Sequence, residues 1–263
     1  MYFKNKIIWI TGASSGTGEA LTYAFDKEYA TLIISARRKD ELERVKSNCQ
    51  NKNNIFILPL DLEKHSELNS KADIVLQKYD KIDILFNNGG ISQRSLAVNT
   101  NFEVDKKLID INYLGTVALT KAVLPSMIKN KAGHIVVMSS LTGKFGTPLR
   151  SAYSGSKHAL HGFFDSLRAE VFDKNIYITI ICAGFIKTNI AKNALTENGG
   201  IQKHDDPSTE AGMLPEYFAQ KTLVAIKNKK QELTIGGKEK LGVYVKRFFP
   251  KIFSNIIRKQ NVR

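Results

Sequence analysis

Ile7-Ile8-Trp9-Ile10 leads directly into Thr11-Gly12-Ala13-Ser14-Ser15-Gly16-Thr17-Gly18, an apolar run followed by a glycine-rich turn. Gly12 permits a tight turn, while Gly16 and Gly18 let the backbone approach a phosphate and let the next helix pack on the strand. The first turn of that helix offers free N–H groups and a partial positive charge to an anion. The spacing Gly-x-x-x-Gly-x-Gly differs from the commoner Gly-x-Gly-x-x-Gly. Its place between a strand and a helix nevertheless predicts a nucleotide site that includes Ser14, Ser15 and Thr17.

Apolar runs alternate with helical periodicity along the rest of the chain. Several of these runs are β-branched throughout, as strands buried on both faces are. The expected strands span residues 7–10, 31–35, 55–60, 82–86, 134–138, 176–182 and 232–235. The expected helices span residues 17–29, 39–50, 66–79, 104–129, 152–173 and 215–228. Connections this short imply right-handed crossovers, so the sequence predicts an α/β fold: a Rossmann-type doubly wound parallel sheet of about seven strands with helices on both faces.

The composition fits one globular domain over residues 1–263. Hydrophobic residues make up 43% of the chain and charged residues 24%, and no apolar run approaches the roughly 18 residues that a membrane-spanning helix needs. Cys49 and Cys182 fall in an expected helix and an expected buried strand, which argues against a disulfide framework and for a reducing, cytoplasmic compartment. Residues 189–214 have the least regular pattern, and we expect them to form a mobile lid.

The formal net charge is +14, and residues 229–263 carry ten Lys and Arg against two Glu. Such charge attracts nucleic acid, anionic lipid or phosphorylated ligands. No interleaved aromatic-basic module lies outside the tail, residues 238–263, so no nucleic-acid partner is expected. Three interpretations of this basic tail remain open: it contacts an anionic membrane surface, covers a substrate mouth or packs against another subunit.

The end of the second expected strand indicates which nucleotide binds. An NAD site has an acidic residue there for the ribose hydroxyls, but this chain has Ser35-Ala36-Arg37-Arg38. Arginine recognises phosphate in a bidentate way, so Arg37 and Arg38 predict the 2′-phosphate of NADP(H). The third strand is followed by Asp61 and Leu62, and the Asp61 carboxylate would accept a hydrogen bond from the adenine amino group. Asn88 and Gly89 follow the fourth strand and would line the adenine and ribose.

Tyr153 and Lys157 stand four residues apart in Tyr-Ser-Gly-Ser-Lys, so a helix would place a phenol and an ammonium on one face. An isolated phenol has a pKa of about 10 and is a poor base at neutral pH, but a cation close by favours the phenolate. Beside a bound nucleotide, this pair is equipped to move a proton together with a hydride. The spacing alone is common by chance, and its combination with the glycine turn is what indicates a redox enzyme.

With these motifs the chain resembles the short-chain dehydrogenase/reductase family over essentially its whole length. The resemblance rests on residues 11–18, 87–90, Asn112, Ser139-Ser140, Tyr153 with Lys157, and 183–188. Residues 35–38 and 87–95 are similar to the member 7 group of that family. Two residues depart from the family pattern: Gly90 stands where Ala is usual, and Ala183 stands where Pro is usual.

The resemblance implies a catalytic tetrad of Asn112, Ser140, Tyr153 and Lys157. Asn112 would anchor a water, Ser140 would hold the substrate oxygen, and Tyr153 would be the general acid or base. Lys157 would tune Tyr153 and contact the nicotinamide ribose. Ser139 competes with Ser140 for its role, since only one of two successive strand residues can face the cleft. The Ile186 backbone and Thr188 would hold the nicotinamide carboxamide.

The hypothesis that follows is an NADP(H)-dependent oxidoreductase that interconverts a ketone or aldehyde and an alcohol. A lipophilic substrate is expected because apolar residues flank the expected nicotinamide site, namely Leu141, Phe145, Leu149, Phe185, Ile190, Leu195 and Met213. An epimerase or dehydratase with the same Tyr/Lys pair, and a nucleotide-binding redox sensor, remain as alternatives. The five histidines show no metal-ligand spacing, so no metal is expected. The family commonly forms dimers and tetramers, so we expect a homodimer or homotetramer and favour subunit packing for the tail.

Overall fold

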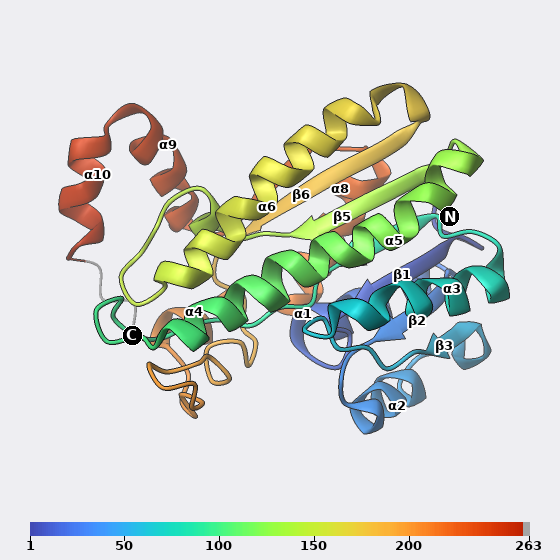
Figure 1. Ribbon diagram of the computed structural model, residues 1–263, viewed down its shortest axis with the longest axis horizontal. Helices are drawn as coiled ribbons and strands as arrows, with labels where there is room; N and C mark the ends of the chain where they lie inside the picture. Colours follow the sequence, from blue (N-terminus) through green and yellow to red (C-terminus); the bar gives the residue numbers. More distant parts are fainter. Residues whose placement is uncertain (260–263) are drawn as a thin grey trace.

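The computed structural model describes residues 1–259 and contains a seven-stranded parallel sheet with the order β3-β2-β1-β4-β5-β6-β7 (Figure 1). The strands are β1 Ile7–Thr11, β2 Thr31–Ser35, β3 Ile55–Ile57, β4 Ile84–Asn87, β5 Gly133–Met138, β6 Ile176–Ala183 and β7 Glu232–Ile235. Ile8 of β1 pairs with Leu32 of β2 on one side and with Ile84 of β4 on the other. The strand order reverses between β1 and β4, and a crevice for ligands is expected there at the carboxyl ends of the strands. The predicted fold class is confirmed.

Helices cover both faces of the sheet, because successive strand side chains point to opposite sides. Ile8 and Ile10 belong to one core with residues of α1, α2 and α8, whereas Trp9 belongs to the other with residues of α3, α5 and α6. The helices are α1 Gly16–Lys27, α2 Lys39–Ser47, α3 Leu68–Tyr79, α4 Phe102–Ile109, α5 Gly115–Asn130, α6 Ser151–Glu170, α7 Pro207–Glu210, α8 Pro215–Lys227, α9 Leu241–Phe248 and α10 Pro250–Ile257.

Residues 104–129 are helical, as expected, but the helix is not α-helical throughout. The segment consists of α4, a π-helical turn at Asp110–Leu114 and α5. Two side chains contact backbone carbonyl oxygens in this turn. Thr116 Oγ1 donates to Asn112 O at 3.0 Å, and His65 Nε2 lies 2.9 Å from Asp110 O. A π turn of this kind often re-aims a side chain at a functional site. The third strand is also shorter than expected and ends at Ile57, although Leu58 N and Leu60 N still donate to Ile34 O and Ala36 O, both at 3.1 Å.

The basic tail forms α9 and α10, which lie beyond the carboxyl ends of the strands (Figure 1). Phe253 of α10 is buried against Phe145, with their ring centroids 5.0 Å apart. Within residues 1–259, no helix combines the length and apolar character needed to cross a membrane.

Candidate active site

Two adjoining cavities lie at the carboxyl ends of the strands. One, of about 550 Å³, is lined by the glycine turn, the end of β2 and residues that follow β3 and β4. The other, of about 540 Å³, is lined by Ser140, Tyr153, residues 183–186 and the helices α9 and α10. Ser92 and Ile190 line both cavities, so the two spaces meet. We refer to them as the nucleotide cavity and the substrate cavity.

The glycine turn has the local geometry that the sequence predicts. Gly12 has a φ of +66°, which favours glycine. A Cβ on Gly18 would collide with Gly12 O, so the close approach of helix and turn needs a glycine there too. The side chain of Asn88 holds this turn: its Nδ2 donates to Thr11 O at 3.0 Å, and its Oδ1 accepts from Thr17 Oγ1 at 2.8 Å. Asn88 therefore braces the turn as well as lining the cavity.

Most of the predicted cofactor residues line the nucleotide cavity. They are Gly12, Ser14, Ser15, Gly16, Thr17, Arg37, Arg38, Asp61, Leu62, Asn88, Gly89 and Thr188. Gly18 lies under the turn, and Ile186 lines the substrate cavity instead. A Cβ on Gly16 would lie 3.1 Å from the Thr188 side chain, so the loop after β6 reaches the phosphate turn. The first half of the expected lid also lines the nucleotide cavity, through Asn189, Asn193, Leu195, Gly199 and Ile201.

The helix α6 carries Tyr153, which lines the substrate cavity, and Lys157, which is buried beside the Tyr153 ring and lines neither cavity. Gln93 fixes the start of this helix, since its Oε1 accepts from the N–H groups of Ala152 at 3.0 Å and Tyr153 at 3.3 Å. The Lys157 Nζ lies 5.8 Å from the centroid of the Tyr153 ring, and both side chains are buried. Lys157 Nζ also donates to Met138 O at 2.7 Å, which fixes the ammonium at the end of β5.

Asn112 reaches the same place from the π-helical turn. Its Oδ1 accepts from Ile91 N at 2.8 Å, and its Nδ2 donates to Ile91 O and to Ser156 Oγ, both at 3.0 Å. A Cβ on Gly90 would lie 2.9 Å from Asn112 Oδ1 and 3.5 Å from Lys157 Nζ. Glycine at position 90, one of the two departures from the family pattern, thus leaves room for both groups.

The two adjacent serines face different surroundings. Ser140 Oγ lines the substrate cavity and donates to Ala183 O at 3.3 Å. Ser139 Oγ is turned away into the protein, 3.0 Å from His161 Nε2. Only Ser140 is therefore placed to contact a substrate.

The pKa values differ from the expectation that Lys157 would lower that of Tyr153. Burial raises the pKa of Tyr153, and the groups that oppose this rise are the Ser140 hydroxyl, Arg150 and Arg94. Burial also lowers the pKa of Lys157 to about 8. Two arginines that sequence analysis assigned to no site therefore lie close enough to the phenol to favour its charged form.

These two arginines form a buried cluster with a residue of the expected lid. Arg94 donates to Asp206 Oδ2 through Nε at 2.8 Å and Nη2 at 2.6 Å, and Arg150 Nη2 donates to the same oxygen at 3.2 Å. None of the three is more than 4% exposed. Burial raises the pKa of Asp206, but the hydrogen bonds and charge of Arg94 outweigh this effect and leave it below the ordinary value. Arg94 lies within residues 87–95, the segment whose sequence resembles the member 7 group, whereas no local sequence pattern marks Arg150 or Asp206.

The substrate cavity has a mostly apolar wall. Of the apolar residues expected there, Leu141, Phe145, Phe185 and Ile190 line it; Leu195 lines the nucleotide cavity, and Leu149 and Met213 line neither. The basic tail contributes Leu241, Gly242, Val245, Phe253, Ile256 and Ile257. Of the three interpretations of the tail, cover over a substrate mouth is the one that this arrangement favours.

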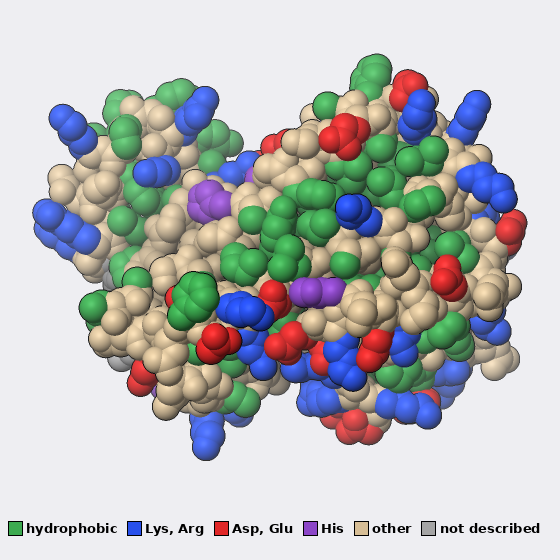
Figure 2. Space-filling model, in the orientation of Figure 1, with side chains coloured by type: hydrophobic (Ala, Val, Ile, Leu, Met, Phe, Trp, Pro, Cys, Tyr) green, Lys and Arg blue, Asp and Glu red, His purple; other side chains and the backbone are tan. Residues whose placement is uncertain are grey.

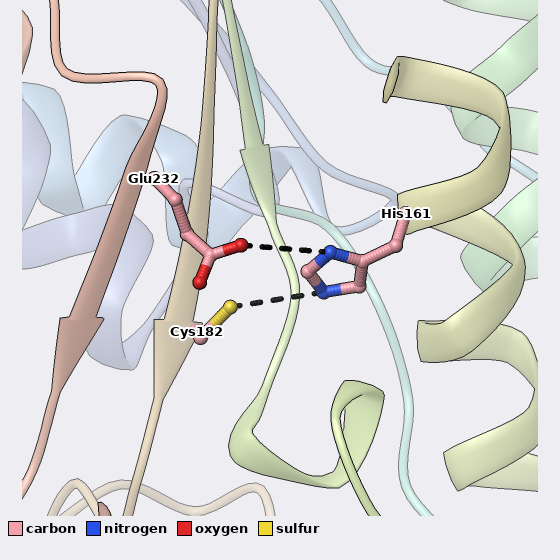
Figure 3. Close-up of side chains that lie close together, drawn as sticks. All are labelled: His161, Cys182 and Glu232. Carbon is pink, nitrogen blue, oxygen red and sulfur yellow. Dashed lines mark hydrogen bonds and ion pairs between the residues drawn. The ribbon is translucent and has the colours of Figure 1, made fainter. Parts of the chain in front are cut away.

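A second polar cluster lies behind Ser139, where His161, Cys182 and Glu232 meet (Figure 3). The ligand atoms of these residues lie within 4.8 Å of one another, which no spacing in the sequence indicates. The imidazole points its two nitrogens at different partners, Nδ1 at Glu232 Oε2 (3.9 Å) and Nε2 at Cys182 Sγ (3.7 Å). Glu232 Oε2 also forms an ion pair with Lys144 Nζ, at a distance of 2.5 Å. Burial lowers the pKa of His161 to about 4 and raises that of Cys182 to about 12, so the imidazole and the thiol are both neutral at physiological pH.

Comparisons with known proteins agree with this geometry. Residues 6–199 match the family model for short chain dehydrogenase. The chain is 41% identical over 264 residues to a Drosophila melanogaster protein named Dehydrogenase/reductase SDR family protein 7-like, covering 98% of this chain and 81% of that one. It is 46% identical over 211 residues to human Dehydrogenase/reductase SDR family member 7, covering 75% and 62% of the two chains.

Solved structures show the same fold. A short chain dehydrogenase/reductase from Burkholderia phymatum in complex with NAD superposes with a TM-score of 0.85 at 19% identity, covering 100% of this chain and 98% of that one. An alcohol dehydrogenase from Thermococcus sibiricus complexed with 5-hydroxy-NADP gives a TM-score of 0.78 at 23% identity, covering 89% and 97%. The extent of the family match and the identity to the member 7 proteins lead to one conclusion: this chain belongs to the short-chain dehydrogenase/reductase family of oxidoreductases.

Proposed function

We propose that the chain is an NADP(H)-dependent enzyme that interconverts a lipophilic ketone or aldehyde and the corresponding alcohol. The observation that carries this proposal is the position of Tyr153 and Ser140 on the wall of the substrate cavity, which adjoins the nucleotide cavity at Ser92 and Ile190. A reduced nicotinamide supplies the hydride when bound. The chain's own residues then have to orient the carbonyl and deliver a proton.

In this proposal, Ser140 Oγ and the Tyr153 phenol hold the substrate oxygen, and the phenol donates the proton during reduction. A neutral phenol, as its burial favours, is the form that a general acid needs. Lys157, fixed by Met138 O, and Asn112, fixed by Ile91, support the phenol from the side away from the substrate cavity. In the oxidation direction, the arginine charges and Lys157 would stabilise the phenolate.

The preference for NADP(H) rests on Arg37 and Arg38. Both are exposed at the rim of the nucleotide cavity, and neither forms an ion pair within residues 1–259. Guanidinium groups that no carboxylate holds are available to bind the 2′-phosphate. Arg37→Ala should lower the ratio of kcat/KM for NADPH over NADH by roughly 10- to 100-fold, the value of a charge-assisted hydrogen bond. Lys39→Ala, an exposed cation that does not line the cavity, is the matched control.

The proton donor is tested by Tyr153→Phe. General acid catalysis is worth about 10²- to 10⁴-fold, so carbonyl reduction followed by NADPH absorbance should fall by at least ~100-fold. NADPH binding measured by fluorescence titration should change little, since the phenylalanine keeps the ring. Retained turnover would show that another group supplies the proton. A separate outcome concerns the wild-type chain. If it binds NADPH but reduces no compound in a panel of carbonyl compounds, the alternative of a nucleotide sensor is favoured.

We infer that residues 189–214 act as a lid, because they contribute to the nucleotide cavity and carry Asp206 of the buried cluster. We also infer that the α9–α10 pair controls entry to the substrate cavity and touches a membrane surface. Large apolar side chains are exposed on this pair, with Phe248 at 69% and Phe249 at 59%, beside Lys246, Arg247 and Lys251. Flotation with anionic liposomes tests the contact, and a chain with Phe248 and Phe249 replaced by Ser should float less.

Self-association is proposed from the other exposed apolar surface. Hydrophobic side chains gather over α5 and α6 in the centre of the face seen in Figure 2. Such a surface suits a second copy of the chain better than water. Light scattering after size exclusion should give a dimer or tetramer. The expected cytoplasmic compartment rests on the two buried, free thiols of Cys49 and Cys182, and cell fractionation tests it.

A further inference from the structure

The buried cluster of Arg94, Arg150 and Asp206 has one more positive than negative charge, and its two arginines lie on the wall of the substrate cavity. Arg94 and Arg150 both line this cavity, while Asp206 is the carboxylate that they share. Two guanidiniums and one carboxylate leave a net charge of +1 in a place where each residue is at most 4% exposed. Burying a charge without a counter-charge costs free energy, so this excess charge points to a functional role.

The unmatched charge belongs to Arg150. Arg94 uses all its nitrogens: Nε and Nη2 bind Asp206, and Nη1 donates to Ser92 Oγ at 2.8 Å and to Gln93 O at 2.6 Å. Within residues 1–259, Arg150 makes one side-chain hydrogen bond, the 3.2 Å contact of Nη2 with an oxygen that Arg94 already occupies. The Nε and Nη1 groups of Arg150 are therefore available to a ligand.

Among the residues of the lining that the structure describes, no other acidic group serves this guanidinium. Glu239 is the other carboxylate of the lining, and its Oε1 accepts from Gly237 N at 2.9 Å and from Phe185 N at 3.3 Å. Arg150 lies over the Phe185 ring, 5.8 Å from its centroid, which fixes the plane of the guanidinium. The preceding residue, Leu149, has a φ of +65°, a strained conformation for a branched side chain that places Arg150 at the start of α6.

We propose that Arg150 binds an anionic group of the substrate, so that the preferred substrates are lipophilic carbonyl compounds that also carry a carboxylate. This inference rests on the proposed function for the site, and it adds a substrate class. The carboxylate would complete the cluster as two guanidiniums facing two carboxylates, while the apolar wall from Phe145 and α9–α10 would cover the hydrocarbon part.

The test compares 4-oxododecanoic acid with its methyl ester, two reducible substrates that differ in one charge and carry the ketone close to the carboxyl group, as Arg150 lies close to Tyr153. Wild-type enzyme should favour the acid in kcat/KM by roughly 10- to 100-fold, and Arg150→Met should bring the acid-to-ester ratio close to one. Lys238→Met removes an exposed cation at the rim of the same cavity and should leave the ratio as in the wild type. A wild-type ratio near one, an equal loss on both substrates in Arg150→Met, or loss of the preference in Lys238→Met would each overturn the proposal.

A binding measurement separates this inference from the proposed reaction. Laurate and lauryl alcohol, neither of which carries a carbonyl to reduce, are titrated by calorimetry into protein saturated with NADPH. Arg150→Met should weaken laurate binding by at least about tenfold and leave lauryl alcohol binding nearly unchanged. This result in a protein that reduces no carbonyl compound would support the anion site and reject the redox function. Equal laurate affinity in wild type and Arg150→Met would reject the anion site whatever the enzyme reduces.

Discussion

Replacement of Arg150 by Met should make the free protein more stable. Burial and the charge of Arg94 lower the pKa of Arg150 from its ordinary value to about 10. Since one pKa unit corresponds to ~1.4 kcal/mol, keeping this guanidinium charged costs on the order of 3 kcal/mol. This net shift already includes the opposing effect of the 3.2 Å bond to Asp206, so the free energy of unfolding should rise by up to ~3 kcal/mol in Arg150→Met.

The partner variant Asp206→Asn should have the opposite effect. It leaves Arg94 and Arg150 buried without a counter-charge, and breaking a buried pair in this way typically costs about 3–5 kcal/mol. Adding Arg150→Met to Asp206→Asn should recover part of that loss, because it removes one of the two like charges. Additive effects of the two substitutions would show that the three residues do not act as one cluster.

Urea denaturation at several pH values measures these effects. The pKa of Arg150 is lower in the folded protein than in the unfolded chain, so the cost of its charge is fully present below about pH 10. The gain from Arg150→Met should therefore be constant between about pH 6 and 9. Asp206 has a lowered pKa, so its stabilisation is present above the ordinary carboxyl pKa and is lost as pH falls through the folded value. Lys129→Met, which removes an exposed cation in the last turn of α5, is the control. A loss of more than ~1 kcal/mol in Arg150→Met would refute the reasoning.

Three further outcomes follow from particular contacts. Gly18→Ala should abolish NADPH binding in a fluorescence titration and lower Tm, because the new methyl group collides with Gly12 O; normal binding would place the phosphate elsewhere. Asn112→Ala removes the hydrogen bonds that join the π-helical turn to Ile91 and should lower stability to urea by ~2–3 kcal/mol, with kcat falling as well; intact stability would contradict the bracing role. Cys182 should not react with a thiol reagent at pH 8 until the protein unfolds, since burial raises its thiol pKa to about 12, and rapid modification of the native chain would show that the cluster opens.

The fold and much of the nucleotide cavity could be predicted because local sequence governs them. A β-branched run with Gly12, Gly16 and Gly18 behind it has few stable conformations, and these already imply a strand, a turn and a helix. Residues 104–129 show the limit of periodicity: they are helical throughout, but the π turn at Asp110–Leu114 is bonded to His65 and Ile91, which lie far away in sequence.

The sequence by itself determined that Tyr153 and Lys157 lie on one face of a single helix, because their spacing fixes their relation. Tertiary structure alone decided the surroundings of those groups. Asp206 lies 112 residues from Arg94 and 56 from Arg150, so only the folded loop and helix bring their charges together beside the phenol. Electrostatic and desolvation energies depend on distance through space and on burial, and neither quantity can be read from spacing along the chain.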